Sequence, residues 1–175
     1  MTNDSIRIRI AQPADYVLVS NIGRFTFYET WQPTNSEEDM QLYLSEAFHP
    51  EKIKKDLENI NNTFLLAYSG NEVVGYSKLR TDRTYDEFKG APSIEMERIY
   101  VTQQFQNMKI GKELMDKCLE IARQGCYEWF WLAVNQYNHK ALDFYKLYGF
   151  TIFGSKSFKL GNTSDDDYLM KLKIS

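Results

Sequence analysis

The sequence has few of the residues that build disulfide frameworks, metal sites or nucleic-acid interfaces. Its only cysteines among 175 residues, Cys118 and Cys126, have neither a metal-ligand spacing nor the pattern of a disulfide framework. Lysines and arginines do not cluster, and the formal net charge is −3, so we expect no nucleic-acid partner. The N-terminal "MTNDSIRIRI" lacks the basic and apolar regions of a signal peptide. These absences predict a cytoplasmic protein without a metal site.

The apolar residues that are present suffice for one folded core. Hydrophobic residues make up 43% and aromatic residues 15% of the chain, which is too many for a disordered protein. They are spread too evenly for a membrane span, and we expect no membrane partner. No linker or internal repeat divides the sequence, and its length suits one unit. We therefore expect residues 1–175 to form a single domain.

Hydrophobic periodicity predicts a mixed succession of strands and helices. The run "IRIRI" alternates with period two, as a half-buried strand does, whereas residues 14–31 have helical spacing. Asn35 or Ser36 is suited to cap a second helix, whose first turn is acidic. The remaining expected elements are a helix from Pro50 to Ile60, a hairpin around Gly70, strands at 93–101, 128–134, 150–158 and 168–174, and helices at 111–122 and 138–148. This order predicts an α/β protein with one mixed sheet.

The stretch "QNMKIGKELM" (residues 106–115) joins a predicted strand to a predicted helix through a glycine-containing turn. A helix N-terminus after a strand presents unpaired backbone N–H groups and the positive end of the helix dipole. Such a turn suits a phosphate or pyrophosphate. Any strand-to-helix loop with a glycine has the same appearance, so the turn alone leaves a purely structural role open.

Two longer stretches, "MERIYVTQQFQNMKIG" and "NHKALDFYKLYGF", resemble the GCN5-related N-acetyltransferase (GNAT) family. The family's loop pattern is Gln/Arg-x-x-Gly-x-Gly/Ala, in which Gln106 and Gly111 match while Lys109 replaces a glycine. All named positions of the family's later helix pattern are present: Asn138, Ala141, Phe144, Tyr145, Gly149 and Phe150. The resemblance implies the GNAT fold, a mostly antiparallel mixed sheet of about seven strands flanked by helices.

The same resemblance implies that acetyl-CoA is the co-substrate and that no metal takes part. Its pantetheine chain is expected to pair with the edge of the strand at 93–101, as another strand would. A backbone N–H of that strand is also expected to steady the oxyanion formed during transfer. The residues that the resemblance places at the cofactor are Ile99, Tyr100, Val101, Gln106, Asn107, Met108, Lys109, Ile110, Gly111, Lys112, Asn138, Lys140 and Tyr145.

The stretch "NSEEDMQLYLSEAFHPEKIKKDLEN", with "MERIYVTQQFQ", is similar to the bacterial spermidine/spermine N-acetyltransferases of this family. This similarity implies direct transfer to a primary amine in a ternary complex, with a polyamine or a similar small amine as acceptor. A protein N-terminus or lysine is the alternative acceptor, and a non-catalytic CoA-binding sensor or interaction module is the alternative function. A homodimer is possible.

Transfer to an amine requires a proton acceptor, because an alkyl amine of pKa about 10.4 is neutral near pH 7.4 only at a cost of roughly 4 kcal/mol. Glu95 and Glu97 are expected on one face of their strand with Ile99 and Val101, since side chains alternate along a strand. We favour Glu97 as the base, acting through water, because the family's polyamine enzymes have a glutamate at the matching place; Glu95 matches the histone-acetylating branch. Either glutamate has the alternative role of pairing with Arg98 or a lysine.

The departing thiolate requires a proton donor, for which Tyr145 is the candidate because of its place in the helix pattern. The alternative is a core tyrosine. Asn138 is suited to cap its helix, and the resemblance implies that it faces the pantetheine region of the cofactor; both roles can hold at once. Lys109 is expected to have a negative φ and to reach a cofactor phosphate together with Lys112. The acidic run Asp165-Asp166-Asp167 is expected to be a solvated turn whose negative charge would attract a polycation.

Overall fold

The predicted alternation of strands and helices is present in the computed structural model, which describes residues 5–160 and 163–174. The strands are β1 (Ile6–Ile10), β2 (Asn62–Ser69), β3 (Glu72–Arg80), β4 (Ser93–Val101), β5 (Trp129–Asn135), β6 (Thr151–Leu160) and β7 (Thr163–Lys173). The α-helices are α1 (Tyr16–Trp31), α2 (Glu37–Ala47), α3 (Pro50–Glu58), α4 (Ile110–Gln124) and α5 (His139–Leu147). Within the described residues the predicted element order is therefore confirmed.

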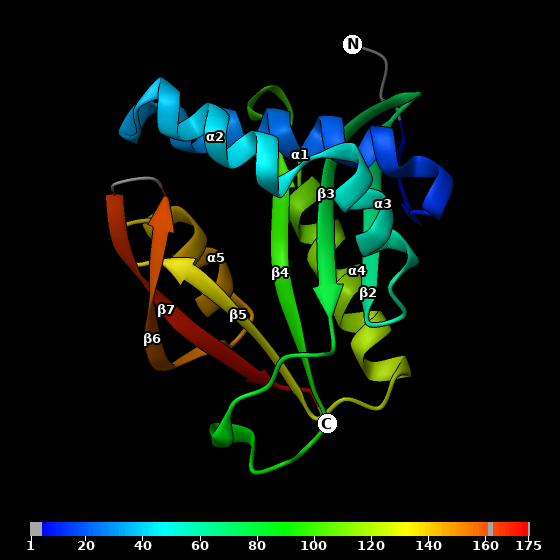
Figure 1. The fold of residues 1–175 in the computed structure, drawn as a ribbon. Helices are drawn as coiled ribbons and strands as arrows, with labels where there is room; N and C mark the ends of the chain where they lie inside the picture. The colour runs from blue at the N-terminus through cyan, green and yellow to red at the C-terminus, as the bar shows by residue number, and fades with distance from the viewer. Residues whose placement is uncertain (1–4, 161–162, 175) are drawn as a thin grey trace.

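One mixed sheet carries all of these strands, in the spatial order β1-β2-β3-β4-β5-β7-β6. Neighbouring strands are antiparallel except β4 and β5, which are parallel and connected through α4. Helices α1, α2 and α3 cover one face of the sheet, while α4 and α5 cover the other (Figure 1). The predicted fold class, a mostly antiparallel mixed sheet flanked by helices, is confirmed.

The helix boundaries follow from local chemistry. The Ser36 hydroxyl accepts a hydrogen bond from the Asp39 N–H at 3.2 Å and so caps α2, whose first turn is acidic as the helix dipole favours. Pro50 occupies the first turn of α3, where a missing N–H costs nothing. Asn138 caps α5 by accepting the Ala141 N–H at 3.2 Å, which confirms its predicted capping role.

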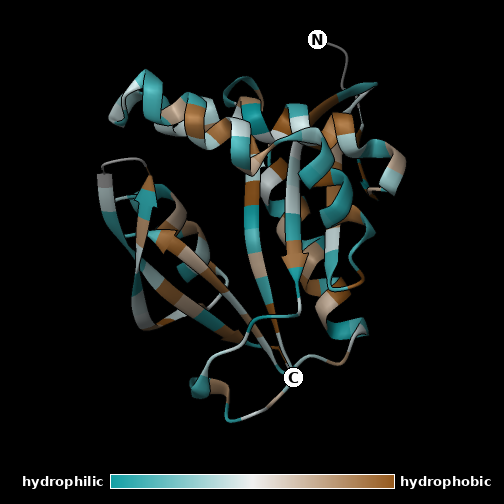
Figure 2. Ribbon diagram, viewed as in Figure 1, coloured by the Kyte–Doolittle hydropathy of each residue, from teal (hydrophilic) through white to brown (hydrophobic). Residues whose placement is uncertain are grey.

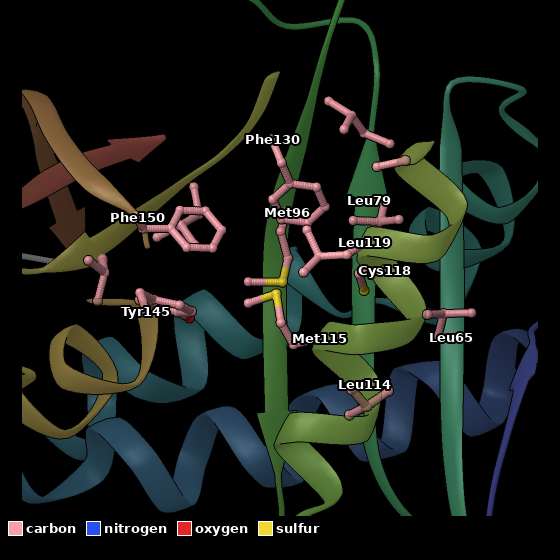
Figure 3. Packing of buried hydrophobic residues seen from close by; sticks show 14 of the residues in the cluster. Leu65, Leu79, Met96, Leu114, Met115, Cys118, Leu119, Phe130, Tyr145 and Phe150 are labelled. Atoms are coloured by element: carbon pink, nitrogen blue, oxygen red, sulfur yellow. The ribbon is translucent and has the colours of Figure 1, made fainter. Parts of the chain in front are cut away.

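The core consists of a layer on each face of the sheet. The layer under α4 and α5 includes Met96, Met115, Cys118 and Phe130, which interlock between helix and strands (Figure 3). The opposite layer packs α1, α2 and α3 against β2 and β3. A smaller cluster of Phe88, Trp131 and Leu169 lies beside it on the same face, over β5 and β7. The residues between these clusters on β4 are hydrophilic (Figure 2), and they form the floor of a cavity.

Strand β7 begins at Thr163, five residues before the predicted start, and this changes the interpretation of the acidic run. Asp165 to Asp167 pair with Phe158 to Lys156 of β6 instead of forming a solvated turn. The prediction was wrong because a β ladder partner is a tertiary feature: three consecutive aspartates have low strand propensity by themselves.

Candidate functional site

Strands β4 and β5 separate along their length and open the sheet. They pair only from Ser93↔Trp129 to Met96↔Leu132, and beyond that point they diverge (Figure 1). A cavity of about 910 Å³ occupies this region. It is lined from one face of the sheet by Trp31 and Tyr43 and from the other by Phe144 and Tyr145. The cavity therefore reaches residues on both faces of the sheet, which a continuous ladder would keep apart.

The exposed edge of β4 beyond the divergence is suited to bind an extended amide chain. Ile99, Tyr100 and Val101 line the cavity, and their other edge pairs with Ser77, Tyr76 and Gly75 of β3. The backbone groups on the cavity side lie outside the β4–β5 ladder, so an added strand-like ligand can pair with them.

A β-bulge in β4 changes which side chains share a face. Lys78 pairs with Arg98 and Leu79 with Met96, so Glu97 is the extra residue. Ile99 and Val101 pack in the layer under α4, whereas the Arg98 guanidinium lies over the Phe48 ring on the opposite face at 4.4 Å. The expectation that the glutamates share a face with Ile99 and Val101 was wrong, because a bulge reverses the alternation of side chains.

Glu97 lies within a group of cations. Its Oε2 is 2.7 Å from the Lys78 Nζ and its Oε1 is 3.5 Å from the Arg80 Nη1. Burial raises the pKa of Glu97, but the charges of Lys78 and Arg98 outweigh burial and lower that pKa to about 2. A carboxylate with such a pKa is a poor proton acceptor near neutral pH. The geometry therefore favours the alternative role of Glu97, ion pairing, over the role as base that the sequence analysis favoured.

Glu95 is the more basic of the two glutamates. Its side chain is only 2% exposed, and burial raises its pKa, while the charge of Arg83 opposes that rise. The Glu95 Oε2 lies 3.5 Å from the Arg83 Nη1 and 3.9 Å from the Arg80 Nε. Both distances exceed those of a close ion pair, so the carboxylate is held without being fully neutralised. Glu95 therefore fits a proton acceptor better than Glu97 does.

Tyr145 enters the cavity from the opposite side of the sheet. Its ring packs against Phe144 and Phe150, and its hydroxyl is directed away from α5 toward β4 (Figure 3). Burial raises the pKa of this phenol, so it keeps its proton at neutral pH. In the part of the chain that the structure describes, no hydrogen bond fixes the hydroxyl, which leaves it available to a guest in the cavity.

The loop before α4 presents backbone donors to the cavity. The first hydrogen bond of α4 runs from the Glu113 N–H to the Lys109 carbonyl at 3.0 Å, so the N–H groups before Glu113 have no acceptor in the helix. Gln106 ties the loop to its surroundings: its Oε1 accepts from the Lys140 Nζ at 2.9 Å, and its Nε2 donates to the Val101 carbonyl at 3.4 Å. This arrangement suits an anionic group of the cofactor.

All but one of the residues predicted to contact the cofactor line the cavity. Met108 is 53% exposed and lies outside the cavity lining, so the structure does not bring it to the site. The Ile110 side chain is buried in the core, so only the Ile110 backbone remains for a ligand. The predicted residues that line the cavity are Ile99, Tyr100, Val101, Gln106, Asn107, Lys109, Ile110, Gly111, Lys112, Asn138, Lys140 and Tyr145.

The backbone of Lys109 is left-handed, with φ 64°, so the prediction of a negative φ was wrong. Asn107 is also left-handed, with φ 67°, and together the two residues turn the chain from strand β4 into α4. This turn explains why a glycine would suit position 109, since an L side chain in this conformation costs about 1–2 kcal/mol.

We expect Lys109→Gly to raise the free energy of unfolding by about 0.5–1 kcal/mol. Relief of the left-handed strain exceeds the extra entropy that glycine gives the unfolded chain. Urea unfolding monitored by fluorescence measures the change. Lys109→Ala is the matched control, because it removes the charge and keeps the strained Cβ. Equal stability changes in the two variants would contradict the strain argument.

Gly111 lies in the first turn of α4, where a Cβ would meet no atom of the protein within 4 Å. The fold itself therefore does not require glycine here. A helical alanine is about 0.5–1 kcal/mol more favourable than glycine. What a methyl group would obstruct is the approach of a ligand to the free N–H groups of the loop.

We accordingly expect Gly111→Ala to unfold at a slightly higher temperature and to bind acetyl-CoA about tenfold more weakly. Thermal unfolding without ligand and the KM for acetyl-CoA measure the two effects separately. An unchanged KM would show that no ligand approaches this turn closely.

Several cavity residues had no recognisable signal in the sequence. Arg83 comes from the loop between β3 and β4 and Phe158 from β6, whereas Asp167 of β7 was expected only as part of a solvated acidic turn. Tyr43 of α2 meets Phe158 at 6.2 Å between ring centroids, which joins two elements more than a hundred residues apart. No periodicity marks such residues, because each appears as an ordinary loop, helix or strand position.

The described residues include no group of three or more His, Cys, Asp or Glu side chains arranged to hold a metal ion. No helix in that part of the chain is long and apolar enough to span a membrane.

Comparison with known proteins gives a consistent result. The model of the acetyltransferase (GNAT) family matches residues 24–150. An uncharacterised N-acetyltransferase from the pepI 3′ region of Lactobacillus delbrueckii subsp. lactis is 33% identical over 86% of this chain and 87% of its own length.

A spermidine N(1)-acetyltransferase of Thermoplasma acidophilum is 23% identical over 97% of this chain and 98% of its own. The crystal structure of the PaiA N-acetyltransferase of the same organism, in complex with coenzyme A, superposes with a TM-score of 0.79. It is 22% identical and covers 97% of this chain and 99% of its own. This organism is archaeal, whereas the sequence resemblance indicated the bacterial branch.

Proposed function

Because the chain belongs to the acetyltransferase (GNAT) family, and so is an acetyl-CoA-dependent N-acetyltransferase, we propose that it acetylates a small primary amine of the polyamine type. The observation that carries this proposal is the opening of the sheet between β4 and β5. One cavity there is lined by Glu95 from one face and by Tyr145 from the other. A proton acceptor and a proton donor can thus act on opposite sides of one guest.

Acetyl-CoA supplies an acetyl group that is activated as a thioester. The residues of this chain fit it along the β4 edge and the loop before α4. Ile99 to Val101 offer backbone groups to the pantetheine amides, and the N–H groups near Gly111 offer donors to the pyrophosphate. Lys109, Lys112 and Lys140 line the same end of the cavity and add positive charge for the phosphates.

Glu95 is the proposed proton acceptor, with a water molecule between its carboxylate and the amine. Its carboxylate is buried at the divergence of the strands, and burial makes it more basic than an exposed glutamate. Arg83 and Arg80 hold the charged form in place at 3.5 and 3.9 Å. Glu97 holds Lys78 and Arg80 and so supports the floor of the cavity.

Tyr145 is the proposed proton donor to the sulfur of the departing thiolate. Its phenol stays protonated near pH 7 because burial disfavours the charged form. Asn138 caps α5 and thereby fixes the N-terminal end of the helix that carries Tyr145.

The polyamine acceptor is supported by the chemistry of the cavity wall and by the spermidine N(1)-acetyltransferase among the relatives. The end of the cavity below α1 and α2 combines carboxylates with aromatic rings, which suit an ammonium group on a methylene chain. The alternative of a non-catalytic sensor was based on Lys109, which replaces a loop glycine. The left-handed backbone at Lys109 strains the loop, but Glu95 and Tyr145 both still line the cavity.

A panel of amines tests the proposal by measuring acetyl-CoA-dependent thiol release. The panel contains spermidine, 1,4-diaminobutane, butylamine and a peptide with a free N-terminus. Turnover with the small amines and none with the peptide supports the proposal. A preference for the peptide would replace it with protein acetylation.

A further inference from the structure

Asp167 lies on the wall of the cavity opposite β4. It pairs in register with Asn135 of β5 and with Lys156 of β6, and all three residues line the cavity. Its neighbour Asp166 faces away from the cavity and accepts a hydrogen bond from the Ser157 hydroxyl at 3.0 Å. Alternation along β7 therefore gives the cavity one of these two aspartates.

The carboxylate of Asp167 is half-buried and carries no countercharge at close range. Within residues 5–160 and 163–174, no side chain forms an ion pair or a hydrogen bond with it. Lys156, its cross-strand neighbour, forms no ion pair with it. Burial, together with Asp165 and Asp166, raises the pKa of Asp167, while Lys156 opposes that rise. By contrast, Glu95 and Glu97 on the other wall are already held by cations.

Aromatic side chains close the space between these two walls. Trp31 and Tyr43 line it from α1 and α2, and Phe158 lines it from β6 beside Lys156. The contact between Tyr43 and Phe158 joins α2 to β6 above the sheet. Aromatic faces attract cations and also pack against methylene groups, so a flexible aliphatic chain with charged ends suits this space.

Together these features point to an acceptor with two cationic groups. We infer that Asp167 is a specificity-determining residue that binds a second ammonium group of the acceptor while the reacting amine lies near Glu95. The cavity then selects diamines and longer polyamines over monoamines. This inference depends on the proposed small-amine acetyltransferase function and deepens it.

A different acceptor would use the cations that line the same cavity. Lys156, Arg83 and Arg98 also line the cavity and would bind a carboxylate on an amino acid. The unpaired state of Asp167 favours the diamine, because a carboxylate-bearing acceptor would place two negative charges near each other.

The test compares 1,4-diaminobutane, butylamine and 4-aminobutanoate, which share the reacting amine and a four-carbon chain. For the wild type we expect the highest kcat/KM with the diamine. Asp167→Asn should lower kcat/KM for the diamine by ten- to thirtyfold, mainly through KM, and leave butylamine within twofold. Asp166→Asn is the matched control, because it removes the same charge from the same strand outside the cavity, and it should change neither substrate. Lys156→Met should strengthen the preference for the diamine.

Two results would overturn the role of Asp167. One is an equal effect of Asp167→Asn on the diamine and on butylamine; the other is 4-aminobutanoate as the best substrate, with a loss in Lys156→Met. If none of the three amines is acetylated, the proposed function fails separately. Calorimetric titration of 1,4-diaminobutane into the wild type and Asp167→Asn then still decides the inference: equal affinity, or no binding to either, refutes it.

Discussion

Tyr145→Phe is expected to lower kcat about a hundredfold while the KM for acetyl-CoA and the melting temperature stay nearly unchanged. The variant removes one hydroxyl and keeps the ring that packs against Phe144 and Phe150. General acid catalysis contributes typically 10²–10⁴-fold, and the lower end applies because water in the cavity can replace part of the donor's role. Since the hydroxyl forms no hydrogen bond to another described residue, its removal leaves no buried partner unsatisfied.

Tyr127→Phe provides the control for this variant. Tyr127 packs against the same core layer but does not line the cavity, so the loss of its hydroxyl should leave kcat intact. Steady-state kinetics with saturating acceptor and a thermal melt of each variant complete the comparison. Normal turnover in Tyr145→Phe would return this residue to the alternative of a core tyrosine.

Glu95→Gln is expected to lower kcat/KM for the acceptor about a hundredfold near pH 7. The amide cannot accept a proton, although its shape matches that of the carboxylate. The loss should be greatest at low pH and should shrink as pH rises toward the pKa of the amine, because the neutral amine then forms in solution. Burial raises the pKa of Glu95, and the inflection of the wild-type pH profile that reports this carboxyl should be absent in the variant, whose kcat/KM should rise with pH only as the amine loses its proton.

The same substitution at position 97 distinguishes the two glutamates. Glu97→Gln removes one of the two carboxylates that pair with Lys78; the other is Asp56, at 3.0 Å. Because the Lys78 side chain is only 3% exposed, the main effect should be on stability. We expect a loss on the order of 2–3 kcal/mol at pH 7 with a much smaller change in the shape of the pH–rate profile. If Glu97→Gln removes the carboxyl inflection and Glu95→Gln keeps it, the assignment of the base is reversed.

The sign of the pH dependence of stability follows from the lowered pKa of Glu97. Its pKa is about 2 in the folded state, compared with 4.5 for a free glutamate. The unfolded chain therefore binds the proton first as pH falls, and the stabilisation is present above pH 4.5 and lost as pH decreases toward about 2. The stability difference between the wild type and Glu97→Gln should consequently shrink across this range in urea unfolding.

Local signals in the sequence predicted most of the secondary structure correctly. Ser36 and Asn138 have the short polar side chains of helix caps, and each caps the helix expected. The period-two run from Ile6 to Ile10 is β1, and the strand expected at 93–101 is β4 with the same ends. Interactions within a few residues decide these features, so the residues themselves contain the information.

The candidate site was only partly predictable, because only some of its features depend on interactions between residues close together in the sequence. Tyr145 and the loop before α4 belong to contiguous stretches, and the structure brings them to one cavity. The relative roles of Glu95 and Glu97 were not predictable, because a bulge opposite Lys78 and Leu79 sets their surroundings. Lys109 was also misjudged, since lysine has no preference for the left-handed backbone that the turn imposes on it.

The sequence by itself determined the succession of elements and the caps of α2 and α5, because periodicity and capping are local. Only the tertiary structure decided that β4 and β5 diverge, that Glu97 is bound by Lys78 while Glu95 stays basic, and that Asp167 faces the cavity while Asp166 does not. Each of these depends on which strand lies beside which and in what register. A shift of one residue in that register moves every side chain to the opposite face, and no local pattern within one strand specifies it.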